Sequence, residues 1–124
     1  MEKPSPEQTQ IMFPGKPELL ETIFQTAQEA IVVTRDRMVK YVNPEFTALF
    51  GYTEDEVIDK NVDDLIWPMT SRAKAELDQI GIKLNAGERI EYETVRRTKD
   101  GRLIHVLVRL SPIFFNDELV GGYS

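Results

Sequence analysis

The stretch from Tyr41 to Glu56 restricts the fold of this chain more than any other. Asn43 and Pro44 predict a helix start, because an asparagine side chain can cap a helix and proline suits the first helical position. Phe46, Leu49 and Phe50 then lie on one face of that helix, at positions i, i+3 and i+4. A glycine stops it, and a threonine with a glutamate three residues later predicts the capping box of a second helix. Helices this short are not stable alone, so they must pack over another element.

Composition excludes several classes of function. A length of 124 residues fits one domain with one core. The net charge of -6 repels phosphate backbones, so we expect no nucleic-acid binding. The chain has no cysteine and one histidine, which removes disulfides, cysteine nucleophiles and Cys/His metal clusters and fits a cytoplasmic location. No apolar run approaches the roughly 20 residues that span a bilayer, so we expect no membrane insertion by this segment.

The chain divides into three expected parts. Residues 1–16 are polar and contain several prolines, which is typical of a flexible leader. Residues 17–28 carry an amphipathic stripe that includes Leu20, Ile23 and Phe24, which predicts a flanking helix. Residues 29–124 form the domain proper, and we expect its last strand to be truncated at the chain end.

Five segments have the β-branched or alternating pattern of strands, two before a helical region and three after it. They are residues 30–34, 38–42, 88–98, 102–115 and 119–123. The helical region holds three short pieces and a longer helix from about Ser71 to Leu84. This order predicts an α+β fold, in which one five-stranded antiparallel sheet carries the helices on one face.

Alternation along the fourth strand assigns the two faces of the sheet. Its uniformly apolar side should face the helices, and the mixed side should face outward. The expected inward residues are Ile104, Val106, Val108 and Leu110, and the expected outward residues are His105, Leu107, Arg109 and Ser111. Because Leu107 is apolar, something should cover the outer face in part, and the stripe of the N-terminal helix is the candidate.

This order of motifs resembles the PAS domain, the sensory module of bacterial signalling proteins such as sensor histidine kinases and diguanylate cyclases. The resemblance covers about residues 19–123. It rests on five short motifs in the right order: Ile31-Val32-Val33-Thr34, Tyr41-Val42-Asn43-Pro44-Glu45-Phe46, the run from Phe50 to Val57, Lys99-Asp100-Gly101 and Ser111-Pro112-Ile113. In this family a signalling helix usually follows the last strand. The resemblance therefore implies a longer protein with an output domain, such as a kinase, cyclase, phosphodiesterase or transcription factor.

The resemblance also implies a pocket between the sheet and the helices. Relatives use this pocket for haem, flavin, small acids or nothing. Transfer by motif predicts that its lining comprises Val32, Thr34, Phe46, Phe50, Leu65, Trp67, Ala73, Leu77, Tyr92, Thr94, Arg96, Val106 and Val108.

Departures from the family pattern restrict the cofactor. Relatives with a flavin–cysteine bond carry cysteine where this chain has Val62. Haem-binding relatives place a histidine on the long helix, which has none here, and His105 is expected on the opposite face. A non-covalent flavin stays open, because Trp67 and Tyr92 could flank its rings. The cofactor is therefore unknown, and we expect none to be retained.

Two different roles are open for Arg96. It lies on the inward side of a strand, where an unpaired guanidinium is costly. It either holds the carboxylate or phosphate of a ligand or is paired within the chain. Trp67 is similarly either a packing residue or a pocket wall. The resemblance further implies a salt bridge between Glu56 and Lys99.

Two functions remain open on the sequence alone. No nucleophile stands beside a base and an orienting group, so we expect no catalysis by this segment. The chain is either a sensing module for a small molecule or a ligand-free dimerisation and spacer module. Both predict a homodimer, with an interface that includes Leu20, Ile23, Phe24 and Leu107.

Overall fold

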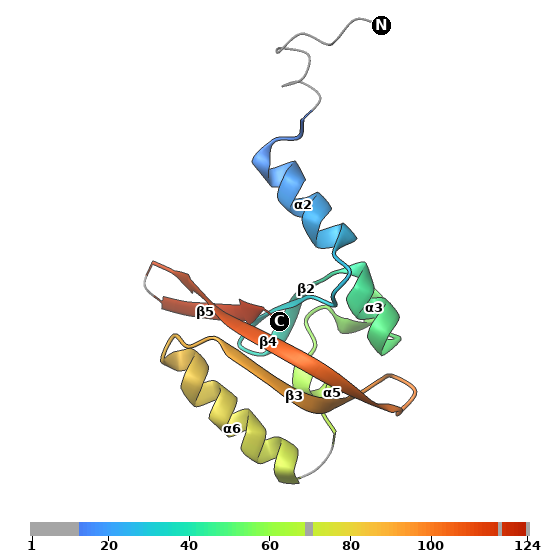
Figure 1. Ribbon diagram of the computed structural model, residues 1–124, viewed down its shortest axis with the longest axis vertical. Coiled ribbons are helices and arrows are strands. Elements are labelled where there is room, and N and C mark those ends of the chain that lie inside the picture. Colours follow the sequence, from blue (N-terminus) through green and yellow to red (C-terminus); the bar gives the residue numbers. More distant parts are fainter. Residues whose placement is uncertain (1–12, 69–70, 117, 124) are drawn as a thin grey trace, which may run out of the picture.

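A computed structural model describes residues 13–68, 71–116 and 118–123, without the side chains of residues 71–74, 77 and 118–123. It contains one antiparallel sheet of five strands in the order β2-β1-β5-β4-β3 (Figure 1). The strands are β1 Val32–Arg35, β2 Met38–Val42, β3 Ile90–Arg97, β4 Leu103–Phe115 and β5 Glu118–Tyr123. The first and last strands pair at the centre, and β2 and β3 form the edges. The predicted five-stranded antiparallel sheet is confirmed.

Four helices connect β2 to β3, and a fifth precedes the sheet. They are α2 Lys16–Thr26, α3 Pro44–Phe50, α4 Glu54–Val57, α5 Val62–Ile66 and α6 Ser71–Asn85. The core forms where the connecting helices pack on the sheet. Its buried side chains are Val32, Val39, Val42, Phe46, Phe50, Val57, Ile66, Trp67 and Ile80. Every connecting helix contributes to this list, so the sheet supports the short helices that could not form alone.

Asn43 joins three segments at the end of β2. Its Oδ1 accepts a hydrogen bond from the backbone N–H of Phe46 at 3.1 Å, which caps α3 as predicted. The same oxygen accepts a bond from the N–H of Ile31 at 2.8 Å, and Nδ2 donates to the carbonyl of Glu29 at 2.9 Å. Asn43 is only 1% exposed. One side chain therefore fixes the first helix of the core and the linker that follows α2.

Glu56 and Lys99 form the predicted salt bridge between α4 and the β3–β4 hairpin. Lys99 Nζ lies 2.5 Å from Glu56 Oε2. The other carboxylate oxygen of Glu56 accepts the backbone N–H of Thr53 at 2.9 Å, which is the expected half of a capping box. These hydrogen bonds, from Lys99 first and then from Thr53, lower the pKa of Glu56 from 4.5 to about 2.

The predicted faces of β4 are confirmed by its exposure. Ile104, Val106, Val108 and Leu110 are partly buried, and the residues that alternate with them from His105 to Arg109 are exposed. Ile104 and Leu110 pack against the core. Leu107 is 52% exposed, so an apolar side chain lies in the open on the outer face.

The helix α2 does not cover this outer face within its own chain, contrary to expectation. It begins one residue earlier and ends two residues earlier than predicted, and it extends away from the sheet (Figure 1). Leu20 and Ile23 are each 54% exposed. An amphipathic stripe indicates that a partner surface is needed but does not specify which one. Of the predicted leader, residues 1–12 lie outside the described residues.

We predict that Asn43→Ala destabilises the fold more than removal of an ordinary helix cap. The substitution removes the cap of α3 and leaves the N–H of Ile31 without its partner, for a total loss of about 2–4 kcal/mol in the free energy of unfolding. Asn61→Ala is the matched control, because Asn61 caps α5 through one bond to the N–H of Asp63. Urea denaturation measures both, and equal losses would contradict the threefold role of Asn43.

We predict that Glu56 stabilises the fold at neutral pH and that this stabilisation is lost in acid. Because its folded pKa is depressed, the stabilisation is fully present above pH 4.5 and is lost as the pH falls toward about 2. The melting temperature of Glu56→Gln should lie below that of the unmodified protein at pH 7, and the difference should vanish near pH 2. Glu54→Gln, in the same helix but not bonded to Lys99, is the control. A difference that stays constant across this pH range would refute the prediction.

Candidate functional site

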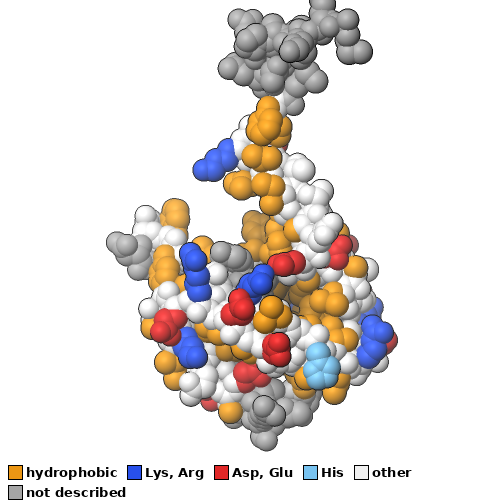
Figure 2. Space-filling view, in the orientation of Figure 1, with side chains coloured by type: hydrophobic (Ala, Val, Ile, Leu, Met, Phe, Trp, Pro, Cys, Tyr) orange, Lys and Arg blue, Asp and Glu red, His pale blue; other side chains and the backbone are white. Residues whose placement is uncertain are grey.

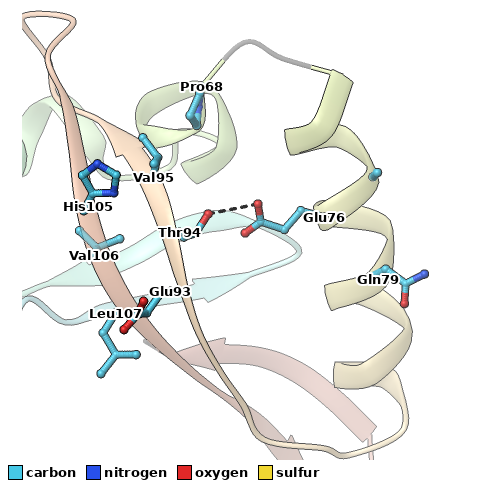
Figure 3. A pocket seen from close by; sticks show the side chains of 10 residues that line it. Pro68, Glu76, Gln79, Glu93, Thr94, Val95, His105, Val106 and Leu107 are labelled. Atoms are coloured by element: carbon cyan, nitrogen blue, oxygen red, sulfur yellow. Dashed lines mark hydrogen bonds between the residues drawn. The ribbon is translucent and has the colours of Figure 1, made fainter.

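An open cleft of about 910 Å³ extends from α6 around the edge strand β3, and residues from both faces of the β3–β4 ladder line it (Figure 3). Its lining comprises Pro68, Ala75, Glu76, Gln79, Glu93, Thr94, Val95, His105, Val106 and Leu107. Thr94 and Val106 are a cross-strand pair on the inner face of the ladder. In Figure 3 the side chains of Thr94 and Glu76 point toward one another across the cleft, whereas Gln79 points away from the sheet. The Oγ1 of Thr94 donates a hydrogen bond to Glu76 Oε2 at 3.3 Å.

The guanidinium of Arg96 is bonded to both of these side chains, although Arg96 is not among the residues that line the cleft. Its Nη2 donates to Glu76 Oε1 at 3.3 Å and to the hydroxyl oxygen of Tyr92 at 2.8 Å. Its Nη1 donates to the carbonyl of Val95 at 3.0 Å and to Thr94 Oγ1 at 3.3 Å. The group is also stacked on Trp67, with Cζ 3.9 Å from the ring centroid. Arg96 is 3% exposed, so it is a fully buried charge with several partners.

These contacts compensate for the free-energy cost of burying the charge of Arg96. An isolated buried guanidinium is strongly unfavourable, and a carboxylate with additional hydrogen bonds is the usual compensation. Glu76 supplies the opposite charge, Tyr92 and Val95 supply neutral acceptors, and the ring face of Trp67 adds a cation–π contact. Burial raises the pKa of Tyr92, so its hydroxyl is protonated at neutral pH. Of the two interpretations of Arg96, the geometry supports pairing within the chain.

The predicted pocket residues lie in three different places. Val32, Phe46, Phe50 and Trp67 are buried in the core, where the rings of Phe46 and Phe50 lie 4.8 Å apart. Leu65 and Tyr92 pack against that core, and Thr34 and Val108 are half-buried. Among the described side chains of the predicted set, the cleft is lined by Thr94 and Val106. The side chains of Ala73 and Leu77 lie outside the described residues. Whether any of these residues binds a ligand stays a prediction.

Sequence reasoning missed Glu76, the residue that links α6 to Arg96. The signal was present, because Glu76 and Arg96 carry opposite charges and lie on elements expected to face one another. The pocket residues predicted on this helix, Ala73 and Leu77, are both apolar, and an acidic residue beside them is usually a solvated surface position. The position of Arg96 on the inner face of β3 could have indicated that a carboxylate was needed opposite it.

Neither a metal centre nor a membrane span is found in the described part of the chain. In those residues, no three His, Cys, Asp or Glu side chains are grouped so that they could hold a metal ion. No helix among them is long and apolar enough to cross a bilayer.

Comparison with known proteins identifies the family. The PAS fold family matches residues 18–123, and the chain therefore belongs to it. The chain is 27% identical over 93 residues to a high-affinity cAMP-specific 3',5'-cyclic phosphodiesterase 8A of Homo sapiens. The match covers 74% of this chain and 11% of that protein, so the chain spans only a small part of that curated relative. PAS domains are sensory modules of signalling proteins rather than catalytic ones.

Two solved structures share the fold. The PAS domain of a Colwellia psychrerythraea protein superposes with a TM-score of 0.72 at 22% identity, covering 88% of this chain and 92% of that one. An RNA-binding light-oxygen-voltage receptor superposes with a TM-score of 0.78 at 22% identity, covering 99% of this chain and 35% of that one. At this identity the likeness establishes the fold alone.

Proposed function

We propose that this chain is the sensing module of a larger cytoplasmic signal-transduction protein and that a small molecule binds between α6 and the β3–β4 ladder. The observation that carries the proposal is the cleft itself. A volume of about 910 Å³ lies within the range of about 300–1,000 Å³ for small-molecule sites. The cleft combines apolar side chains with two polar groups that converge, Thr94 and Glu76, and small-molecule sites usually combine apolar side chains with a few polar groups. The output domain would lie outside this chain.

Transmission requires the ligand to bind two packings of the domain with different affinity. The structure offers a physical connection from the cleft to α2. Arg109 on β4 lies 3.1 Å from Glu91 on β3 and 3.5 Å from Glu29 in the linker after α2. These pairs are exposed and weak individually, but Asn43 holds the same linker through buried bonds. Movement of β3 would therefore reach the helix that we expect to pair with a second copy.

A second candidate function is a ligand-free spacer that dimerises and transmits signals made elsewhere. Its support is the filled interior, because Phe46, Phe50 and Trp67 occupy the space where the family resemblance placed a pocket. A non-covalent flavin is less well supported. One face of Trp67 is covered by Arg96 and the residue is buried, so little of its ring is free to stack on a flavin.

We predict that some compounds of a metabolite library bind in the cleft. In ¹H–¹⁵N NMR spectra, the shift changes should concentrate on α6 and on the strands around Thr94 and Val106. Ala75→Phe should abolish these changes, because an added ring on the exposed, cleft-lining Ala75 competes with the ligand for space. A library that perturbs no residue of the cleft would refute sensing at this site and favour the spacer.

We predict that the chain is a homodimer through α2. Replacing both Leu20 and Phe24 by glutamate should yield monomers, because it places charge on the apolar stripe. The matched control replaces Thr22 and Gln25, exposed residues of the same helix, by glutamate. Sedimentation velocity distinguishes the two. An unchanged sedimentation coefficient for the Leu20/Phe24 variant would refute this interface.

A further inference from the structure

We propose that the free edge of β3 binds an extended, basic segment of another protein, which adds to the sheet as a further strand. A protein partner at this edge would be separate from the small molecule of the proposed function, and neither requires the other. Three features of β3 support the assignment: its open edge, the direction of its backbone groups and the charge of the side chains beside it.

The two edges of the sheet differ in what covers them. At the β2 edge, the backbone of residues 59–61 continues the ladder. Val39 donates its N–H to the carbonyl of Lys60 at 2.9 Å and accepts the N–H of Asp59 at 2.8 Å. Among the described residues, no segment pairs in this way with the free edge of β3. Such an edge presents unpaired N–H and C=O groups to any extended chain.

The backbone of β3 directs the groups of alternate residues to the free edge. Thr98, directly after β3, donates its N–H to the carbonyl of Arg102 at 2.9 Å, so these two residues are a hydrogen-bonded pair of the hairpin. Hydrogen-bonded pairs recur at every second residue of an antiparallel ladder, so the even-numbered residues of β3 bond to β4. Glu91, Glu93 and Val95 therefore direct their N–H and C=O groups away from β4.

The free edge is accessible because the cleft passes around it. The lining of the cleft includes Glu93 and Val95 from the outer face of β3 and Thr94 from the inner face. The carbonyl of Val95 already accepts a hydrogen bond from the side chain of Arg96 at 3.0 Å. A carbonyl oxygen has two lone pairs, so it can accept a second bond from an added strand.

The charges beside the edge favour a basic partner. The described lining of the cleft includes the carboxylates of Glu76 and Glu93 and neither lysine nor arginine. Glu76 is paired with Arg96, whereas Glu93 is exposed and forms no ion pair within the described residues. Figure 2 shows acidic side chains, in red, among hydrophobic ones on the face that β3 and β4 cross. A cation directly opposite Glu93 on an added strand would stabilise the pairing.

A second copy of the chain fits this edge less well than a basic segment does. Two identical edges would bring two copies of Glu76 and Glu93 to one cleft, and like charges on paired strands are destabilising. Charged side chains on edge strands deter the pairing of identical strands in this way. A basic segment neutralises the same carboxylates, so charge complementarity selects it as the occupant.

The geometry also fixes the pattern of the segment. Residues that are directly opposite each other in a ladder place their side chains on the same face. The residue opposite Glu93 would therefore bond its backbone to β3 and place its side chain beside the carboxylate. Its two neighbours would point toward the inner side of the cleft, where Ala75 and Val106 are apolar. The matching segment thus alternates cationic and apolar side chains.

The probe is a short peptide in which lysine and valine alternate, added to the unmodified chain while amide hydrogen exchange is followed by NMR. We expect slower exchange of the N–H groups of Glu91, Glu93 and Val95, which face the free edge. The N–H groups of Tyr92 and Thr94 should change little, because β4 already holds them. Methylation of the lysine backbone nitrogens should abolish binding, because these N–H groups pair with β3. Methylation of the valine nitrogens is the matched control and should not.

The charge of Glu93 is tested by substitution. We expect Glu93→Lys to weaken peptide binding at least about tenfold, because the substitution repels the lysine opposite it. Glu88→Lys makes the same change at an exposed position before β3 and should weaken binding less than about threefold. Equal affinities of the two variants would overturn the inference.

Three exchange results would also overturn it. They are no slowing at the edge amides, equal slowing along the whole strand, and slowing that increases with protein concentration without peptide. The last would assign the edge to a second copy. Shift changes that small molecules cause on α6 are measured without the peptide, so they test the proposed function separately.

Discussion

The burial of the Arg96 guanidinium determines how α6 and the segment after α5 pack on the sheet. Arg96 lies on the inner face of an edge strand, 3% exposed, and its partners outside that strand tie two further segments to it. Trp67 closes over it after α5, Tyr92 turns toward it from the same strand, and Glu76 ties α6 to it. Without an opposite charge the group could not be kept away from water. The position of α6, and with it the cleft, follows from this requirement.

A second constraint, the hydrogen bonding of Asn43, fixes the linker after α2 and the start of α3. Asn43 holds the linker after α2 and the start of α3 through three hydrogen bonds. The first helix of the core and the entry into β1 therefore cannot move independently. Lys99 joins the β3–β4 hairpin to the same region, since its N–H donates to the carbonyl of Phe50 at 2.8 Å. A chain of hydrogen bonds therefore joins the β3–β4 hairpin, α3 and the linker after α2.

The features that could be predicted from the sequence are those that depend on local residue patterns. The cap at Asn43, the left-handed Gly51, the faces of β4 and the Glu56–Lys99 pair were all readable from spacing or from family motifs, and all are confirmed. The cleft could not be predicted from the sequence. Its position depends on whether Phe46, Phe50 and Trp67 fill the interior, and on which carboxylate reaches Arg96. Those outcomes are set by packing in three dimensions. The stripe of α2 likewise predicted an apolar helix but not the surface that it meets.

We infer that the contact between Arg96 and Glu76 holds α6 against the sheet. A double-mutant cycle with Arg96→Met and Glu76→Gln, followed by urea unfolding, measures this contact directly. We expect a coupling free energy of at least about 1 kcal/mol, because one partner is fully buried. A coupling within about 0.3 kcal/mol of zero, as many exposed ion pairs give, would contradict it.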